Sequence, residues 1–319
     1  MSYVLGIDGG GSKTICVLID DSHQVLGRGE SGSSNYQSIG IEATLKSIKS
    51  AIKNAVDEVK IINTLKIDAI CLGLAGVGRV ADIKVVKGLV KELYNQNFLP
   101  IVWALQPANI VICNDAFIAL VGGIGQPVGI VVAAGTGSIV LGRNHQGDIK
   151  RVGGWGYILG DEGSAYKIAI AGMNAALKSY DGREMSTSLI EYFKHHLDLE
   201  NIEDLIEVIY RRGWGVKKIA SLAPIVDFAA ASGDIVANII IDDAVKELVK
   251  ATSTVIDAIF SSDSIVEVVT TGSVWRGRCK IHDRFAESIV HKFPKVQVIF
   301  PRYEPAYGAG LLALQTTQI

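Results

Sequence analysis

The chain has 319 residues, 49% of them hydrophobic and 20% charged, which is typical of a folded globular protein with room for two domains. Lysine and arginine (31 residues) nearly balance aspartate and glutamate (33 residues), and no basic segment interleaved with aromatic residues occurs, so we expect no nucleic-acid partner. The apolar runs are far shorter than a membrane span, the first residues lack the basic segment of a signal peptide, and the four cysteines show no CxxC spacing. We therefore expect a cytoplasmic protein without a membrane-spanning segment.

The first two predicted strands, 4–7 and 15–19, are joined by the turn Asp8-Gly9-Gly10-Gly11-Ser12-Lys13-Thr14. Three consecutive glycines leave the backbone amides uncovered, and the serine and threonine add hydroxyl groups, so this turn suits anionic oxygens such as those of a phosphate. It is not a P-loop, because a serine stands where a P-loop has lysine and a strand follows instead of a helix. A plain hairpin turn is the alternative, although two residues would suffice for it.

A predicted amphipathic helix (41–59), a buried strand (69–74) and a second helix follow, and the next strand, 110–113, ends in Asn114-Asp115. A carboxylate at the carboxyl end of a strand in an α/β sheet points into the crevice where ligands bind. Asp115 also suits the N-cap of the helix that follows, and the two roles are compatible.

The opening pattern then repeats. Strands are predicted at 128–133, 139–142 and 147–152, and the first two are joined by Ala134-Gly135-Thr136-Gly137-Ser138. The repetition of three strands around a Gly/Ser/Thr turn indicates a duplicated α/β unit with one phosphate-binding turn in each copy.

The stretch 153–164 is the richest in glycine, and among its glycines stand Trp155 and the acidic pair Asp161-Glu162. Glycines at this density are expected where backbone turns sharply or runs close to a ligand. A buried turn before a capped helix is the alternative. A largely helical segment runs to about residue 260. A late strand then ends in Thr271-Gly272-Ser273, another strand covers 296–300, and Pro305 starts the last helix.

This order of motifs resembles the N-acetylglucosamine kinase branch of the BadF/BadG/BcrA/BcrD ATPase family, within the sugar kinase, Hsp70 and actin superfamily. The resemblance runs from Asp8 to the last helix, and the stretch 153–164 is its most specific part. It implies an α/β fold of two duplicated RNase H-like (actin-like ATPase) domains around a central cleft. The first domain is expected at 1–117 plus 302–319, and the second at 118–301, with a helical insert at about 182–260.

The resemblance also implies the residues of the site. The phosphates of ATP are expected at Gly10, Gly11, Ser12 and Thr14 and at Gly135, Thr136, Gly137 and Ser138, and the adenosine at Gly272 and Ser273. Asp8 is expected to hold Mg²⁺, through water. The amino sugar is expected at Asn35, Asp115, Gly154, Trp155 and Asp161, with Asp115 as the general base.

The implied activity is ATP- and Mg²⁺-dependent phosphorylation of the 6-hydroxyl of an amino sugar, N-acetylglucosamine first, by a homodimer. Glucosamine and N-acetylmuramic acid stay open as acceptors; Arg79 or Arg151 could meet the lactyl carboxylate of the latter, but the sequence places neither near the sugar. One alternative is an iron–sulfur activator ATPase of 2-hydroxyacyl-CoA dehydratases, although the cysteines lie mainly in strand patterns. A second is an actin- or Hsp70-like nucleotide switch. A third, a glucokinase with structural zinc, would need clustered cysteine and histidine, whereas here both are dispersed.

Overall fold

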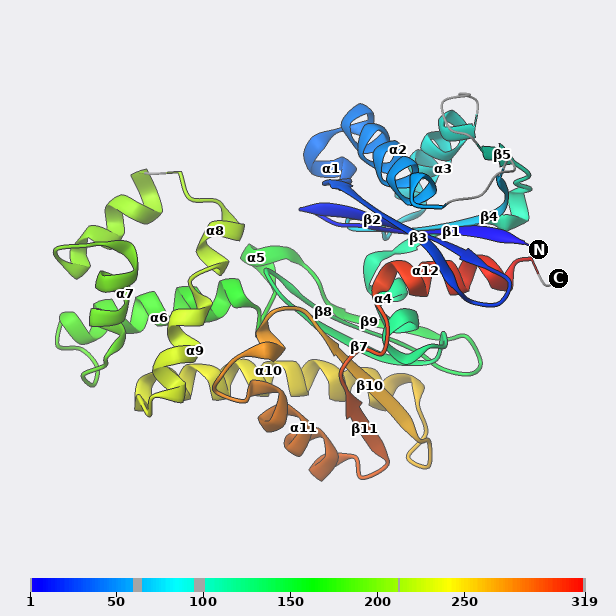
Figure 1. Ribbon diagram of the computed structural model, residues 1–319. Coiled ribbons are helices and arrows are strands. Elements are labelled where there is room, and N and C mark those ends of the chain that lie inside the picture. Colours follow the sequence, from blue (N-terminus) through cyan, green and yellow to red (C-terminus); the bar gives the residue numbers. More distant parts are fainter. Residues whose placement is uncertain (1, 60–64, 95–100, 212, 318–319) are drawn as a thin grey trace. The chain divides into compact units, whose positions relative to one another are not determined.

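The computed structural model describes residues 2–59, 65–94, 101–211 and 213–317 (Figure 1). Contacts between Cα atoms divide it into two units, Met1–Val128 with Pro301–Ile319 (unit 1) and Gly129–Phe300 (unit 2). We expected the first domain to end at residue 117, inside α4 (Asp115–Ile124), whereas unit 1 continues to Val128. The reason is that α4 packs closely on the last helix, α12 (Pro305–Gln315): a Cβ at Gly308 would lie only 2.2 Å from the Ile118 carbonyl oxygen.

The sheet of unit 1 has the order β3-β2-β1-β4-β5, and β6 also pairs with β4. Strands β1 to β3 form an antiparallel meander, and β4, β5 and β6 run parallel to β1. The strands are β1 (Tyr3–Gly9), β2 (Lys13–Asp20), β3 (Val25–Gly32), β4 (Leu65–Leu74), β5 (Ile101–Trp103) and β6 (Ile110–Asn114).

Helices cover both faces of this sheet (Figure 1). The buried side chains of α2 and α3 form one core with the apolar residues of β1, β2 and β4. On the other face α12 approaches β1 at two glycines, since a Cβ at Gly6 would lie 2.3 Å from the Gly310 amide nitrogen. The remaining helical segments of unit 1 are α1 (Tyr36–Ile39), α2 (Ile41–Asp57), α3 (Val80–Tyr94) and the 3₁₀ turn η1 (Pro107–Asn109).

Unit 2 repeats the topology of unit 1. Its sheet has the order β11-β10-β7-β8-β9, in which β7 to β9 are antiparallel and β10 and β11 run parallel to β7. The strands are β7 (Gly129–Ala134), β8 (Ser138–Arg143), β9 (Ile149–Gly153), β10 (Val266–Thr271) and β11 (Val296–Ile299). The duplicated α/β architecture expected from the sequence is therefore confirmed.

The helices of unit 2 build one large core around the sheet. The long helix α10 packs on β8 and β9 and also on α9 and α11, so the segment expected as an insert contributes to the core of unit 2. The helical segments are α5 (Gly156–Leu159), α6 (Ala165–Tyr180), α7 (Leu189–Leu197), η2 (Ile202–Asp204), η3 (Glu207–Arg211), α8 (Val216–Ala220), α9 (Ala223–Ala231), α10 (Ile235–Ile259), η4 (Val274–Arg276) and α11 (Ile281–Lys292).

No single helix in the described part of the chain is long and apolar enough to cross a membrane. One bent pair, Val216–Ala231 with Ile235–Ile259, reaches the required length and composition together, with an angle of 118° between its parts.

Candidate active site

The first glycine-rich turn joins β1 to β2 and is closed by its own backbone. The Gly10 N–H donates to the Lys13 carbonyl at 2.9 Å. Gly11 and Ser12 form the exposed apex, and a Cβ at Gly11 would meet nothing within 4 Å. The Thr14 hydroxyl is buried and donates to a carbonyl of β3 at 2.7 Å. An anion can therefore approach the apex of the turn, whereas Thr14 lies beneath it.

Asp8 and Asp115 lie where β1 and β6 end, and both strands run parallel to β4. Their side chains therefore gather at the same edge of the sheet. The N-cap of α4 is Asn114, whose side-chain oxygen accepts from the Ala116 N–H at 2.9 Å. Asp115 is the first residue inside the helix and accepts from the same N–H at 3.0 Å.

Negative charge outweighs positive charge around the Asp8 carboxyl group at this edge. Burial, and then the charges of Asp115 and Glu304, raise the pKa of Asp8 from 3.8 to about 7, although Lys13 opposes the shift. Burial also raises the pKa of Asp115. A divalent cation would stabilise both ionised forms. Within the described ranges no three His, Cys, Asp or Glu side chains form a group that could hold a metal ion. Magnesium suits such a sparse set, because it keeps several waters and binds phosphates as well.

Asn35 lies beside the loop that follows β4. It caps α1, with its side-chain oxygen accepting from the Gln37 N–H at 3.1 Å, and the same oxygen is 3.1 Å from the position that a Cβ would take at Gly76. Arg79, in this loop, is held by Asp82: its Nε donates to the carboxylate at 3.3 Å and its backbone N–H at 2.8 Å. Its guanidinium is therefore already paired.

The second turn joins β7 to β8 in unit 2. The Gly135 N–H donates to the Gly137 carbonyl at 2.9 Å, and Thr136 is exposed at the apex. Ser138 is buried, and its hydroxyl donates to the Glu162 carbonyl at 2.7 Å. Thr136 is thus open to a ligand, while Ser138 ties the turn to the stretch 153–164.

Asp161 supports this second turn from below. Asp161 is buried and has a φ of +60°. Its carboxylate accepts from the backbone N–H groups of Ser138 and Gly156. Burial raises its pKa. A Cβ at Gly137 would lie 2.7 Å from the carboxylate, so a side chain there would force the Asp161 side chain to shift. The N-cap of α6 is Ser164, which accepts from the Lys167 N–H at 3.3 Å. The residue expected at the sugar therefore also shapes the second turn, where phosphate is expected.

Trp155 stands in the same stretch but faces solvent. The residue is 65% exposed, and the guanidinium carbon of Arg151, on β9, lies 4.5 Å from the ring centroid. The backbone around it is tight. Gly154 has a φ of +70°, and a Cβ there would lie 2.8 Å from the Ile139 side chain. Gly160 packs on the Trp155 Cβ. The backbone thus holds the ring at its base, the Arg151 guanidinium lies over the ring, and much of the residue stays exposed.

The third turn, after β10, lies next to the second. Gly272 has a φ of +105°, and a Cβ there would lie 2.2 Å from the Ala134 carbonyl oxygen. The Ser273 amide nitrogen lies 4.0 Å from the Cβ position of Gly135. Beside Ser273 opens a cavity of about 480 Å³, which is a normal size for a small-molecule site. Its walls come from α6, from α8 to α10 and from residues 273–281.

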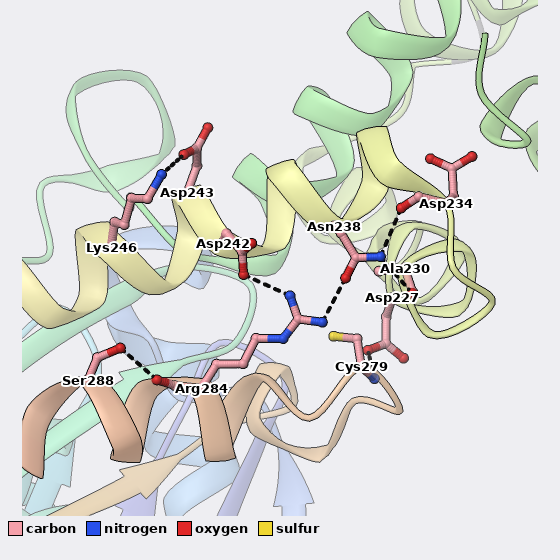
Figure 2. Close-up of polar contacts among 10 residues, drawn as sticks. All are labelled: Asp227, Ala230, Asp234, Asn238, Asp242, Asp243, Lys246, Cys279, Arg284 and Ser288. Carbon is pink, nitrogen blue, oxygen red and sulfur yellow. Dashed lines mark hydrogen bonds and ion pairs between the residues drawn. The ribbon is translucent and has the colours of Figure 1, made fainter. Parts of the chain in front are cut away.

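Asp227, on α9, joins two walls of this cavity, a role that the sequence did not suggest. Its carboxylate accepts from the backbone N–H groups of Arg278 at 2.8 Å and Cys279 at 3.0 Å. Asp227 and Cys279 lie side by side in Figure 2. A Cβ at Gly277 would lie 2.3 Å from the same carboxylate. Burial and the bond to Asp227 raise the pKa of the Cys279 thiol to about 12, which disfavours the thiolate form.

A second contact holds α11 to the helices of the cavity wall. The Arg284 guanidinium donates to Asp242 and to Asn238 of α10, both at 2.7 Å (Figure 2). The Asn238 amide in turn donates to the Ala230 carbonyl at 2.9 Å. The segment 277–284 is thus fixed at two points on the helices α9 and α10.

Each unit brings part of the predicted site together. In unit 1 these are the first turn, Asp8 and Asp115, with Asn35 by the β4 loop; in unit 2 they are the two further turns, Asp161 and the cavity. Partners such as Asp227 and Cys279 are 52 residues apart, and no local pattern marks them.

Known proteins resemble this chain over nearly its whole length. The model of the BadF/BadG/BcrA/BcrD ATPase family matches residues 5–313. An N-acetylmuramic acid/N-acetylglucosamine kinase from Clostridium acetobutylicum is 37% identical, and an N-acetyl-D-glucosamine kinase from Dictyostelium discoideum is 34% identical; both alignments cover 98% of each chain. A solved structure from Chromobacterium violaceum, described as a candidate N-acetylglucosamine kinase, superposes with a TM-score of 0.74 at 24% identity over 99% of both chains, which supports the fold. The chain therefore belongs to the BadF/BadG/BcrA/BcrD ATPase family, as its order of motifs predicted.

Proposed function

We propose that this protein is an ATP-dependent kinase that phosphorylates an amino sugar, with N-acetylglucosamine as the first acceptor to consider. Two relatives that match nearly the whole chain are named as kinases of this sugar. The structural observation that carries the proposal is the cavity beside Ser273, because it opens next to the second glycine-rich turn. A nucleoside in the cavity would place its phosphates toward backbone amides suited to them.

We assign the catalytic roles to the carboxyl groups of unit 1. Asp115 is proposed as the general base that accepts the proton of the sugar's 6-hydroxyl, and its raised pKa makes it a stronger base than an ordinary aspartate. Asp8 is proposed to hold Mg²⁺ through water. The metal, when bound, would neutralise charge on the transferring phosphate, which is the main requirement of phosphoryl transfer.

The remaining assignments follow the same proposal. The amides of Gly10, Gly11 and Ser12 and those of residues 135–138 would hold the phosphates, with Thr14 shaping the first turn from below. Asn35, Gly154, Trp155 and Asp161 would contact the sugar. We treat the two units as the two domains of the kinase, and we propose a cytoplasmic homodimer from the family resemblance.

The competing reading is a nucleotide-switched ATPase without a sugar substrate. Its iron–sulfur form would need cysteines that can ligate a cluster. Here Cys16 and Cys71 are buried in strands, Cys113 is half-buried, and Cys279 is buried beside Asp227.

The test is a coupled ADP-release assay with Mg-ATP. The panel contains N-acetylglucosamine, glucosamine, N-acetylmannosamine, N-acetylmuramic acid and glucose, with a no-sugar blank. We expect release that depends on an amino sugar. Slow release that no sugar stimulates would refute the kinase proposal and favour the nucleotide switch.

A further inference from the structure

The loop after β4, residues 75–79, lies between the two carboxyl groups at the edge of the unit 1 sheet. Strand β4 pairs in parallel with β1 on one side and with β6 on the other. Asp8 lies near the end of β1, and Asp115 follows β6. Ligands of α/β sheets bind outside the carboxyl ends of such parallel strands. The topology of the sheet therefore places this loop at the border of the site in unit 1.

Side chains from two other elements hold the loop. Gln37, on α1, donates from its side-chain amide to the Gly76 carbonyl at 2.8 Å. Asn114, the N-cap of α4, donates from its side-chain amide to the Val77 carbonyl at 3.0 Å. Because Asn114 immediately precedes Asp115, the loop is bonded directly to the segment that carries the proposed base.

The backbone N–H groups of the loop are all bonded within the protein except one. Those of residues 78 and 79 donate to the Asp82 carboxylate at 3.1 and 2.8 Å. Those of residues 75 and 77 donate to carbonyls at the ends of β1 and β4, at 2.8 and 3.2 Å. In the part of the chain that the structure describes, the Gly76 N–H has no acceptor. Gly76 is exposed and has no side chain to cover this donor.

A second open donor lies beside the first. The side-chain oxygen of Asn35 caps α1 and lies 3.1 Å from the position that a Cβ would take at Gly76. The nitrogen of the same side-chain amide has no acceptor within the described ranges. The oxygens of both groups are thus already bonded, whereas both N–H groups are open. Two neighbouring donors suit one oxygen atom of a ligand, since its two lone pairs can accept from both.

We propose that loop 75–79 is part of the acceptor site, where the Gly76 N–H and the Asn35 amide bind one oxygen atom of the amino sugar. Gln37 is the positioning residue that holds the loop for this contact. This inference rests on the proposed kinase function, and it gives the loop no part in the transfer of the phosphoryl group. The oxygen belongs to a ring hydroxyl or to the acetamido carbonyl.

The direct test is hydrogen exchange of the backbone amides, measured by NMR with and without saturating N-acetylglucosamine. Exchange at Gly76 should slow by about fivefold or more in the complex, because its N–H gains an acceptor. The other N–H groups of the loop are already bonded and should change less. Unchanged exchange at Gly76, in a protein with sugar-dependent ADP release, would overturn this proposal and leave the kinase function intact.

The kinetic test is Gln37→Met, which keeps the length of the side chain and removes its bond to the loop. KM for N-acetylglucosamine should rise about 3- to 10-fold, whereas kcat and KM for ATP should stay within about twofold. Gln106→Met is the matched control: Gln106 is an exposed glutamine of unit 1 whose side chain forms no hydrogen bond in the described part of the chain. Equal effects of the two substitutions, or an equal rise of both KM values in Gln37→Met, would show that Gln37 does not position the acceptor.

Sugar analogues identify the oxygen that is bound. Glucosamine lacks the acetamido carbonyl, and the 3-deoxy and 4-deoxy forms of N-acetylglucosamine each lack one ring hydroxyl. Gln37→Met should not raise KM for the analogue that lacks the bound oxygen, because that contact is already lost. An equal rise for every analogue would refute a direct contact with the loop. A wild type that phosphorylates no amino sugar would instead refute the kinase proposal, and this inference with it.

Discussion

Replacing Asp8 by asparagine is predicted to stabilise the metal-free protein while it abolishes kinase activity. The substitution keeps the shape of the side chain and removes one of the negative charges at the edge of the unit 1 sheet. In the folded protein burial and the charges of Asp115 and Glu304 oppose ionisation of Asp8. Above neutral pH the wild type must nevertheless ionise this group, which costs free energy of folding.

The pKa shift gives the size of the effect. A rise from 3.8 to about 7 corresponds to about 4 kcal/mol at a pH above both values. Asp8 is only half-buried, so solvent screening reduces this to about 2 to 4 kcal/mol. Such a gain would raise Tm by roughly 5 °C in a chain of this length.

The sign of the pH dependence follows from the same shift. Between pH 4 and 7 folded Asp8 keeps its proton, whereas the unfolded chain has lost it. The folded state then binds more protons, so wild-type stability falls as pH rises. Asp8→Asn has no such group, and its advantage should be small near pH 4 and complete above about pH 8.

The assay is thermal and urea unfolding of both proteins at pH 5 and pH 8, in chelator and in excess Mg²⁺. Magnesium should stabilise the wild type and have less effect on the variant. A variant less stable than the wild type at pH 8 in chelator, or an advantage independent of pH, would refute the electrostatic argument.

Three other substitutions test separate parts of the site. Asp115→Asn should lower kcat by about 100- to 10,000-fold while calorimetry still detects sugar binding. Loss of both kinase activity and sugar binding would indicate that Asp115 anchors the sugar and is not the general base. Asp227→Asn should raise KM for ATP about tenfold and leave KM for the sugar unchanged, because one of the two N–H groups of Arg278 and Cys279 loses its acceptor. Asp243→Asn is the matched control, since Asp243 is exposed and paired with Lys246. Equal effects of the two substitutions on KM for ATP would contradict a role of segment 277–279 in ATP binding. Gly272→Ala should lower the free energy of unfolding by more than about 2 kcal/mol, and an unchanged urea midpoint would contradict the φ of +105° and the short approach to Ala134.

The sequence predicted the duplicated α/β fold because the relevant signals are local. Each half starts with strands joined by a Gly/Ser/Thr turn, and both turns were found where they were expected. Strand β5 and helix α11 were not predicted: β5 has three residues, and no prediction covered the segment that forms α11. Three residues are too few to show a strand period, so β5 is defined by its pairing with β4.

The tertiary structure decided which polar groups are available. Thr14 and Ser138 belong to the expected phosphate turns, yet their hydroxyls bond to the protein. Arg79 and Arg151 are alike in the sequence, but Asp82 neutralises only the first. Residue type determines what a polar group can bind. Whether that group is already bonded within the protein depends on segments distant in the sequence, so only the folded chain determines it.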